Sequence, residues 1–124
     1  MNADRAHIEA VVAVYLEGLY QCDTDLLAGV FHPQAVYATA SEATPLVLGL
    51  SDYLPIVAKR EPPARSNAPR SEEILLIDVV GPSTAMVKLR CQFFQKHYVD
   101  FLTLIKVKGE WRIISKVFHF DPVK

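Results

Sequence analysis

The stretch "YVDFLTLIKVKGEWRIISKVF", residues 98–118, decides the fold of this chain. Two apolar runs flank a Lys-Gly pair, and this pattern is typical of two β-strands joined by a tight turn. Each run also contains a charged residue: Asp100 in the first run and Lys116 in the second. Because a charge inside an apolar strand needs either a partner or a function, these two residues are the first candidates for a site.

Two more β-type runs precede this hairpin, "EEILLIDVV" (72–80) and "STAMVKLRCQFF" (83–94). In the second of them every other residue from Ala85 to Phe93 is apolar, which indicates a strand with one face in the core. The hairpin strands are instead apolar on both faces. Such strands are usually covered twice, so we expect helices on one face and a second copy of the chain, forming a homodimer, on the outer face of the sheet.

The N-terminal third of the chain predicts helices. From residue 3 to residue 20, apolar residues recur at the spacing of one helix face. These residues are Ile8, Val11, Val12, Tyr15, Leu16 and Leu19. Asp23 is a good N-cap for a second, short helix with Phe31 among its inward residues, and Pro33 ends that helix near His32.

The middle of the chain predicts two strands and a third helix. The strands are "AVYAT" (35–39) and "LVLGL" (46–50), and Ser51 is positioned to cap the helix, which Pro55 shortens or kinks. An order of helices followed by strands predicts an α+β fold, and we expect one domain spanning residues 1–124.

Composition excludes several classes of protein. Thirteen basic and fourteen acidic residues give a net charge of −1, so we expect no nucleic acid or membrane partner. The basic residues Lys59 and Arg60, with "RSNAPR" (65–70), indicate a solvated loop, with an anion site as the alternative. The first ten residues are charged and polar, so we expect a cytoplasmic protein. Cys22 and Cys91 lack a CxxC spacing and indicate reduced, structural thiols.

The hairpin turn determines which residues share a face. A two-residue loop, Lys108-Gly109, requires a positive φ at lysine, whereas a three-residue loop, residues 107–109, requires the left-handed conformation only at Gly109, so we expect the longer loop. That register places Asp100 directly opposite Lys116. The other residues of the same face are then Leu102, Leu104, Ile114 and Phe118. Asp100 and Lys116 then form either a structural cross-strand ion pair or the polar part of a pocket.

Two segments carry a resemblance to a known superfamily. "VYLEGLYQCDTDLLAGVFHPQAVY" (14–37) resembles the opening pattern, and residues 98–118 resemble the closing hairpin, of the nuclear-transport-factor-like superfamily, which includes ketosteroid isomerases, scytalone dehydratase and SnoaL-like polyketide cyclases. Within it, the chain is most similar to the bacterial group named putative lumazine-binding. The resemblance implies a cone of N-terminal helices packed on a curved, mixed, mostly antiparallel sheet, open at one end to an apolar pocket and usually dimeric.

The resemblance also implies roles for individual residues. Tyr15 matches the tyrosine, and Asp100 the protonated aspartic acid, that bind the enolate in ketosteroid isomerases. Thr39 stands where the catalytic base of those enzymes lies, and a threonine cannot take the proton. Lys116 is a second departure, because a cation facing Asp100 favours the ionised carboxylate. Steroid-type isomerisation is therefore not expected.

The remaining candidates are wall residues of the pocket. They are Phe31, Tyr37, Thr39, Tyr53 and Phe118, with Lys116 among them as a polar contact. His97 and His119 have the opposite strand parity and should point to the dimer face or the end of the sheet. The histidines lack HxH and HxxxH spacings, and the glycines lack phosphate-loop spacing, so we expect no metal and no cofactor.

Three functions remain open from the sequence. The first is binding of a small, partly apolar organic ligand in the pocket through Tyr15, Tyr37, Asp100 and Lys116. The second is an enzyme of the isomerase, cyclase or dehydratase kind, with Asp100 as general acid or base and Tyr15 holding the ligand. The third is an accessory or interaction module with a filled core. A cavity above about 300 Å³ beside Asp100 favours the first two functions.

Overall fold

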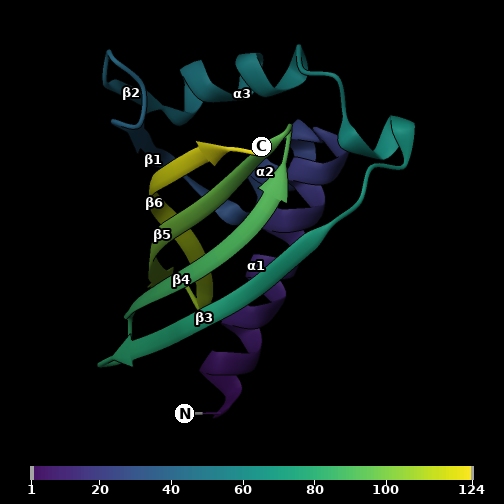
Figure 1. Ribbon diagram of the computed structural model, residues 1–124. Coiled ribbons are helices and arrows are strands. Elements are labelled where there is room, and N and C mark those ends of the chain that lie inside the picture. The colour runs from purple at the N-terminus through teal and green to yellow at the C-terminus, as the bar shows by residue number, and fades with distance from the viewer. Residues whose placement is uncertain (1, 124) are drawn as a thin grey trace.

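The computed structural model describes residues 2–123. The order of helices and strands along the chain is α+β, as the sequence predicts (Figure 1). The helices are α1 (Asn2–Gln21), α2 (Thr24–Val30), α3 (Leu50–Ala58) and the short 3₁₀ helix η1 (Pro63–Ser66). The strands are β1 (Phe31–Thr39), β2 (Leu46–Gly49), β3 (Ser71–Val80), β4 (Thr84–Phe93), β5 (Lys96–Val107) and β6 (Glu110–Pro122).

The strands form one mixed sheet in the order β2-β1-β6-β5-β4-β3. Only β1 and β6 are parallel, and the other neighbours are antiparallel. The sheet curves around α1, and α3 lies at the end of the cone where the C-terminus emerges, opposite the N-terminal end of α1 (Figure 1). The predicted cone of helices on a curved sheet is therefore confirmed.

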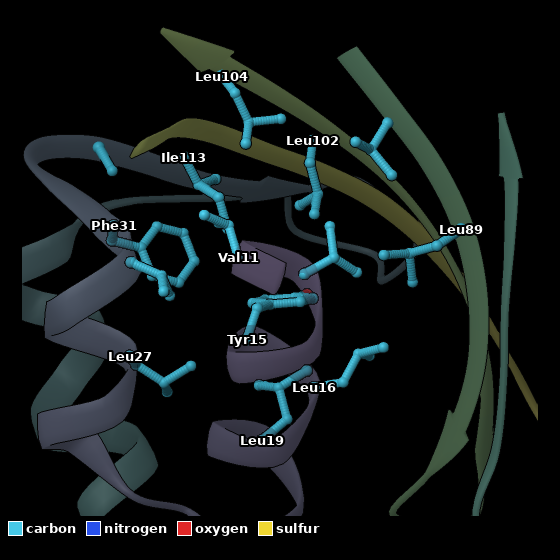
Figure 2. Packing of buried hydrophobic residues seen from close by; sticks show 14 of the residues in the cluster. Val11, Tyr15, Leu16, Leu19, Leu27, Phe31, Leu89, Leu102, Leu104 and Ile113 are labelled. Atoms are coloured by element: carbon cyan, nitrogen blue, oxygen red, sulfur yellow. The ribbon is translucent and has the colours of Figure 1, made fainter. Parts of the chain in front are cut away.

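The core lies between α1 and the inner face of the sheet. Figure 2 shows Leu89, Leu102, Leu104 and Ile113 pointing from the strands toward the face of α1 that carries Tyr15. The predicted alternation of β4 is confirmed, because its odd-numbered residues from 85 to 93 are buried. Burial of such side chains removes apolar surface from water. Each Å² of buried apolar surface stabilises the fold by about 25 cal/mol, and this is the main stabilising contribution.

Two local contacts fix α1 in place. Gly18 allows α2 to approach closely, because a Cβ atom there would lie 2.7 Å from Cδ2 of the buried Leu27. Near the start of α1, Oδ1 of Asp4 accepts hydrogen bonds from Nζ of Lys106 at 3.0 Å and from Nε1 of Trp111 at 3.1 Å. The helix is thus attached both to α2 and to the β5–β6 hairpin.

The predicted register of the hairpin is wrong. The turn has two residues, Lys108 with φ 53° and Gly109 with φ 80°, because a turn with two positive φ angles matches the twist of the flanking strands. A bulge after Thr103 then shifts the pairing, so Asp100 pairs with Phe118. The bulge also turns Ile114 away from the core, and Ile113 takes its place on the inner face.

Despite this shift, Asp100 and Lys116 share one face of the sheet as predicted, and that face is the inner one. Both are buried, at 0% and 4% exposed, and Lys116 pairs with Leu102 instead of Asp100. The shift equals two residues, which preserves the alternation of faces along a strand. The two charges are therefore diagonal neighbours in the core.

Two predicted element boundaries also need correction. The cap of α3 is Gly49, and no side chain makes a capping hydrogen bond there, so Ser51 lies inside the helix. The strand β1 begins at Phe31, which pairs with Ile113 of β6, so α2 ends before His32. In contrast, Asp23 caps α2 as predicted, because its carboxylate accepts from the backbone N–H groups of Asp25 and Leu26.

Candidate functional site

The centre of the cone contains a buried tyrosine–aspartate pair. Tyr15 lies in the middle of α1 and points toward the sheet (Figure 2), and its hydroxyl donates a 2.6 Å hydrogen bond to Oδ2 of Asp100 on β5. Burial, and after it the charge of Asp100, raise the pKa of Tyr15 well above its ordinary value of 10.0. The hydroxyl therefore stays protonated at neutral pH and can donate this hydrogen bond.

Two buried polar atoms, one in this pair and one on Tyr53, lack hydrogen-bond partners in the described part of the chain. Among residues 2–123, nothing forms a hydrogen bond with Oδ1 of Asp100 or with the hydroxyl of Tyr53, although both atoms are buried. An unsatisfied buried polar group costs about 1–3 kcal/mol, and more if it is charged. Native cores contain few such groups, and each one requires an explanation.

Lys116 lies in a cage of aromatic rings. Its Nζ atom is 4.7 Å from the ring centroid of Phe118, 5.2 Å from that of Tyr15 and 5.3 Å from that of Tyr37. These are cation–π distances. Within the described part of the chain, no carboxylate oxygen lies within 4.0 Å of this Nζ, so Lys116 and Asp100 do not form the direct cross-strand ion pair.

The charge on Lys116 is maintained by its surroundings. Burial alone would lower the pKa of Lys116, but the negative charge of Asp100, with smaller contributions from neighbouring groups, raises it above the ordinary value of 10.5. The side chain is therefore an ammonium at neutral pH. It can attract an anion or donate hydrogen bonds, but it is not a nucleophilic amine.

The predicted wall residues gather around this lysine. Tyr37 stacks on Tyr53 with ring centroids 4.1 Å apart and lies 4.9 Å from Phe118, while Phe31 contacts both Tyr15 and Tyr53 edge-on. The remaining predicted wall residue, Thr39, is also buried. Its hydroxyl donates to the backbone carbonyl of Phe118 at 2.8 Å, so this side chain ties β1 to β6.

A small cavity lies beside Lys116. Its volume is about 10 Å³, which is room for about one water molecule. Its lining includes Lys116, Arg60, Tyr37, Phe93, Phe94 and Tyr98. In this conformation the interior is therefore far smaller than the roughly 300 Å³ of a typical ligand pocket, and its size matches the filled-core alternative.

Arg60 is the residue of this site that sequence reasoning missed. It follows α3, where the sequence predicts a solvated loop, but it is half-buried, and its guanidinium lies 5.3 Å from the ring centroid of Phe94 and 5.9 Å from that of Tyr53. Because Phe94 belongs to the β4–β5 turn, no local pattern around residue 60 could indicate the contact.

The histidines lie outside this site. His97 and His119 are exposed, in agreement with their predicted parity, and His119 bonds to Ser41 Oγ at 3.0 Å and to Asp121 Oδ2 at 3.1 Å. Across residues 2–123, no group of three or more histidine, cysteine, aspartate or glutamate side chains is arranged to hold a metal ion. None of the described helices is long and apolar enough to cross a membrane.

Solved structures share the fold of this chain. An NTF-2 like protein of unknown function from Silicibacter pomeroyi DSS-3 superposes with a TM-score of 0.87 at 22% identity, covering 97% of this chain and 98% of that one. A ketosteroid isomerase-like protein from Erwinia carotovora atroseptica gives a TM-score of 0.77 at 15% identity, with coverage of 97% and 98%. A cystatin-like fold protein from Burkholderia xenovorans LB400 gives 0.72 at 16%, with coverage of 96% and 92%.

Sequence comparison gives one partial match and one family. The aldolase FrzH of Cladobotryum sp is 40% identical over 50 residues, and the match spans 37% of this chain and 40% of that protein. The family model described as putative lumazine-binding matches residues 3–119. Because that match covers nearly the whole cone, with both Tyr15 and Asp100 inside it, the chain belongs to the putative lumazine-binding family.

Proposed function

We propose that this protein binds a small organic molecule in the interior of the cone, next to Lys116. The observation that carries this proposal is that three polar groups are buried close enough to influence one another's charge. Oδ1 of Asp100 and the hydroxyl of Tyr53 have no hydrogen-bond partner among residues 2–123, and the ammonium of Lys116 lies among aromatic rings. The family description and the shared fold support a ligand-binding role.

The cost of these groups favours a ligand over a filled core. Replacing buried charged residues by apolar residues of similar volume often leaves the stability of a protein unchanged or raises it. Stability alone therefore gives no reason to keep Asp100 and Lys116 inside the cone. A ligand that donates one hydrogen bond to Asp100 Oδ1 and accepts one from Lys116 satisfies both groups. The same ligand can accept a further bond from the Tyr53 hydroxyl.

Binding requires the mouth of the cavity to open. Arg60 and Phe94 contact each other through a cation–π interaction between two loop segments, and exposed or half-exposed side chains change rotamer on the picosecond to nanosecond scale. Outward rotation of these two side chains enlarges the cavity without moving a strand. The filled-core alternative requires no such motion and predicts that no organic molecule enters.

Fragment binding followed by NMR distinguishes these alternatives. A panel of neutral and charged aromatic fragments is added to the protein, and amide and lysine side-chain signals are compared with those of Lys116→Met. The matched control is Lys88→Met, because Lys88 also lies over an aromatic ring, that of Phe101 at 5.8 Å, but on the opposite side of the sheet. Ligand binding in the cone predicts shifts around Lys116 that only Lys116→Met removes, whereas a filled core predicts none.

We further propose that the protein is a cytoplasmic homodimer joined through the outer face of the sheet. Three apolar side chains of β1, β5 and β6 share this face: Val36, Phe101 and Val117 are 40%, 47% and 48% exposed. An open groove of about 350 Å³ runs beside Phe101 and Val117. Sedimentation of the wild type and of Phe101→Glu tests this proposal, which predicts a dimer that the substitution converts to a monomer.

A second candidate function is proton transfer on a carbonyl compound. It is favoured by the free Oδ1 of Asp100, held in place by the Tyr15 hydrogen bond on Oδ2, and the partial likeness to an aldolase supports it. In this reaction Oδ1 accepts the proton from the carbon next to the carbonyl, that C–H bond breaks, and Lys116 stabilises the enolate oxygen. Exchange of the α-hydrogens of pyruvate in D₂O, lost in Asp100→Asn, would support catalysis.

A further inference from the structure

Two cationic side chains line the cavity at the mouth of the cone. Lys116 lies on its inner side, in the aromatic cage, and Arg60 lies between the rings of Tyr53 and Phe94. Both side chains are at least half removed from solvent. Buried or half-buried cations are normally paired with anions, so the partners of these two residues are informative.

The nearby carboxylates do not neutralise Arg60. In the part of the chain that the structure describes, no carboxylate oxygen lies within 4.0 Å of its guanidinium. The adjacent Glu61 is exposed and pairs with Arg65 at 2.8 Å instead. Asp100, the anion nearest to Lys116, accepts its hydrogen bond from Tyr15.

The tyrosines around the cavity do not supply the missing negative charge. Burial raises the pKa of Tyr98 to about 12 and also raises the pKa of Tyr53. Burial, and then Asp100, raise the pKa of the Cys91 thiol beside the cavity to about 12. Tyr53, Tyr98 and Cys91 are therefore neutral at physiological pH and do not balance the positive charges of Lys116 and Arg60.

We propose that the ligand of this protein is a small organic monoanion, with a carboxylate or comparable oxyanion held between Lys116 and Arg60 and a flat apolar body against the surrounding aromatic rings. This inference rests on the proposed binding function and narrows its ligand class. The planar guanidinium of Arg60 can hold a carboxylate with two parallel hydrogen bonds, while Lys116 contributes a point charge. The stacked rings of Tyr37 and Tyr53 provide a flat apolar surface.

A pair of matched probes tests the charge of the ligand. Binding of 2-naphthoate and of its neutral analogue 2-naphthamide is measured by calorimetry on the full chain. We expect the carboxylate to bind at least about tenfold more tightly than the amide, the usual scale for one charge-assisted contact in a desolvated site. Equal affinities of the two probes would overturn the inference, while the proposed binding function would stand.

Substitutions of Arg60 test whether its guanidinium binds the carboxylate. Arg60→Gln should reduce the affinity for 2-naphthoate about tenfold and leave that for 2-naphthamide unchanged, whereas the neighbouring Arg65→Gln serves as the control and should change neither. Arg60→Lys keeps the charge but loses the planar fork, so it should give an intermediate affinity. The inference is wrong if Arg60→Gln and Arg65→Gln bind the carboxylate equally well.

The two proposals fail in different ways. If neither naphthalene probe binds but neutral fragments shift the Lys116 signals, the ligand is not an anion and the binding function survives. If no probe and no fragment shifts the signals around Lys116, the binding function itself is wrong. The denaturation midpoint of each variant, measured in parallel, shows that a loss of affinity is not a loss of folded protein.

Discussion

The hydroxyl of Tyr15 donates a 2.6 Å hydrogen bond to Oδ2 of Asp100, and this contact joins α1 to β5 across the centre of the cone. Both side chains are fully buried, so the bond is not weakened by exchange with water. It holds the carboxyl group in one orientation, with Oδ2 toward the helix and Oδ1 buried without a partner among the described residues.

Tyr15→Phe should destabilise the protein by about 1–3 kcal/mol, because it leaves a buried carboxylate without its only hydrogen-bond donor among the described residues. Urea denaturation followed by circular dichroism measures this change. An unchanged denaturation midpoint would mean that the bond contributes nothing net to stability.

Tyr53→Phe should have the opposite effect on stability. Its hydroxyl is buried without a partner, so removing it should stabilise the fold by about 1 kcal/mol, the desolvation cost of one such group. The same substitution should weaken ligand binding. A destabilised variant would show that the hydroxyl is satisfied in solution and would remove one of the three groups on which the binding proposal depends.

Gly18→Ala should destabilise the contact between α1 and α2 by about 1–3 kcal/mol, the usual cost of overpacking. The new Cβ would meet the buried Leu27 at 2.7 Å. The matched control is Gly29→Ala in α2, where nothing lies within 4 Å, and the higher helix propensity of alanine should stabilise by about 0.5–1 kcal/mol. Thermal denaturation of both variants tests the difference in sign.

The start of α1 should detach from the hairpin in acid. Hydrogen bonds from Lys106 and then Trp111 lower the pKa of Asp4 below its ordinary value of 3.8. A lowered pKa means that this contribution to stability is present above pH 3.8 and is lost as the pH falls through the folded-state value. The protection of the second-turn amides of α1 against hydrogen exchange, corrected for the intrinsic rate at each pH, should therefore fall in strong acid, and Asp4→Asn should already show that lower protection at neutral pH.

The sequence predicts most of the architecture but not its register. Spacing alone identifies α1 and the inner face of β4, because both patterns are long and regular. The hairpin turn could not be predicted, since Lys108 adopts a positive φ angle that lysine rarely favours, and the bulge at Ile114 depends on the curvature of the whole sheet. The error of two residues nevertheless left Asp100 and Lys116 on the predicted face.

The site divides in the same way. Strand parity and the resemblance to the superfamily point to Tyr15, Asp100 and Lys116, and the structure brings these side chains together. Nothing in the sequence places Arg60 beside them, because its position comes from contacts with Tyr53 on α3 and Phe94 in the β4–β5 turn. Contacts between distant segments leave no periodic signal in the sequence.

The most direct test of the central claim is a carbon–proton correlation spectrum of the lysine side chains, with the Lys116 signal identified by its loss in Lys116→Met. Because Nζ of Lys116 lies over three aromatic rings, we expect its ε-methylene signal far upfield of the other lysines and expect it to move when 2-naphthoate is added. If an excess of 2-naphthoate changes neither the Lys116 chemical shift nor that of any residue lining the cavity, the result would contradict ligand binding in the cone.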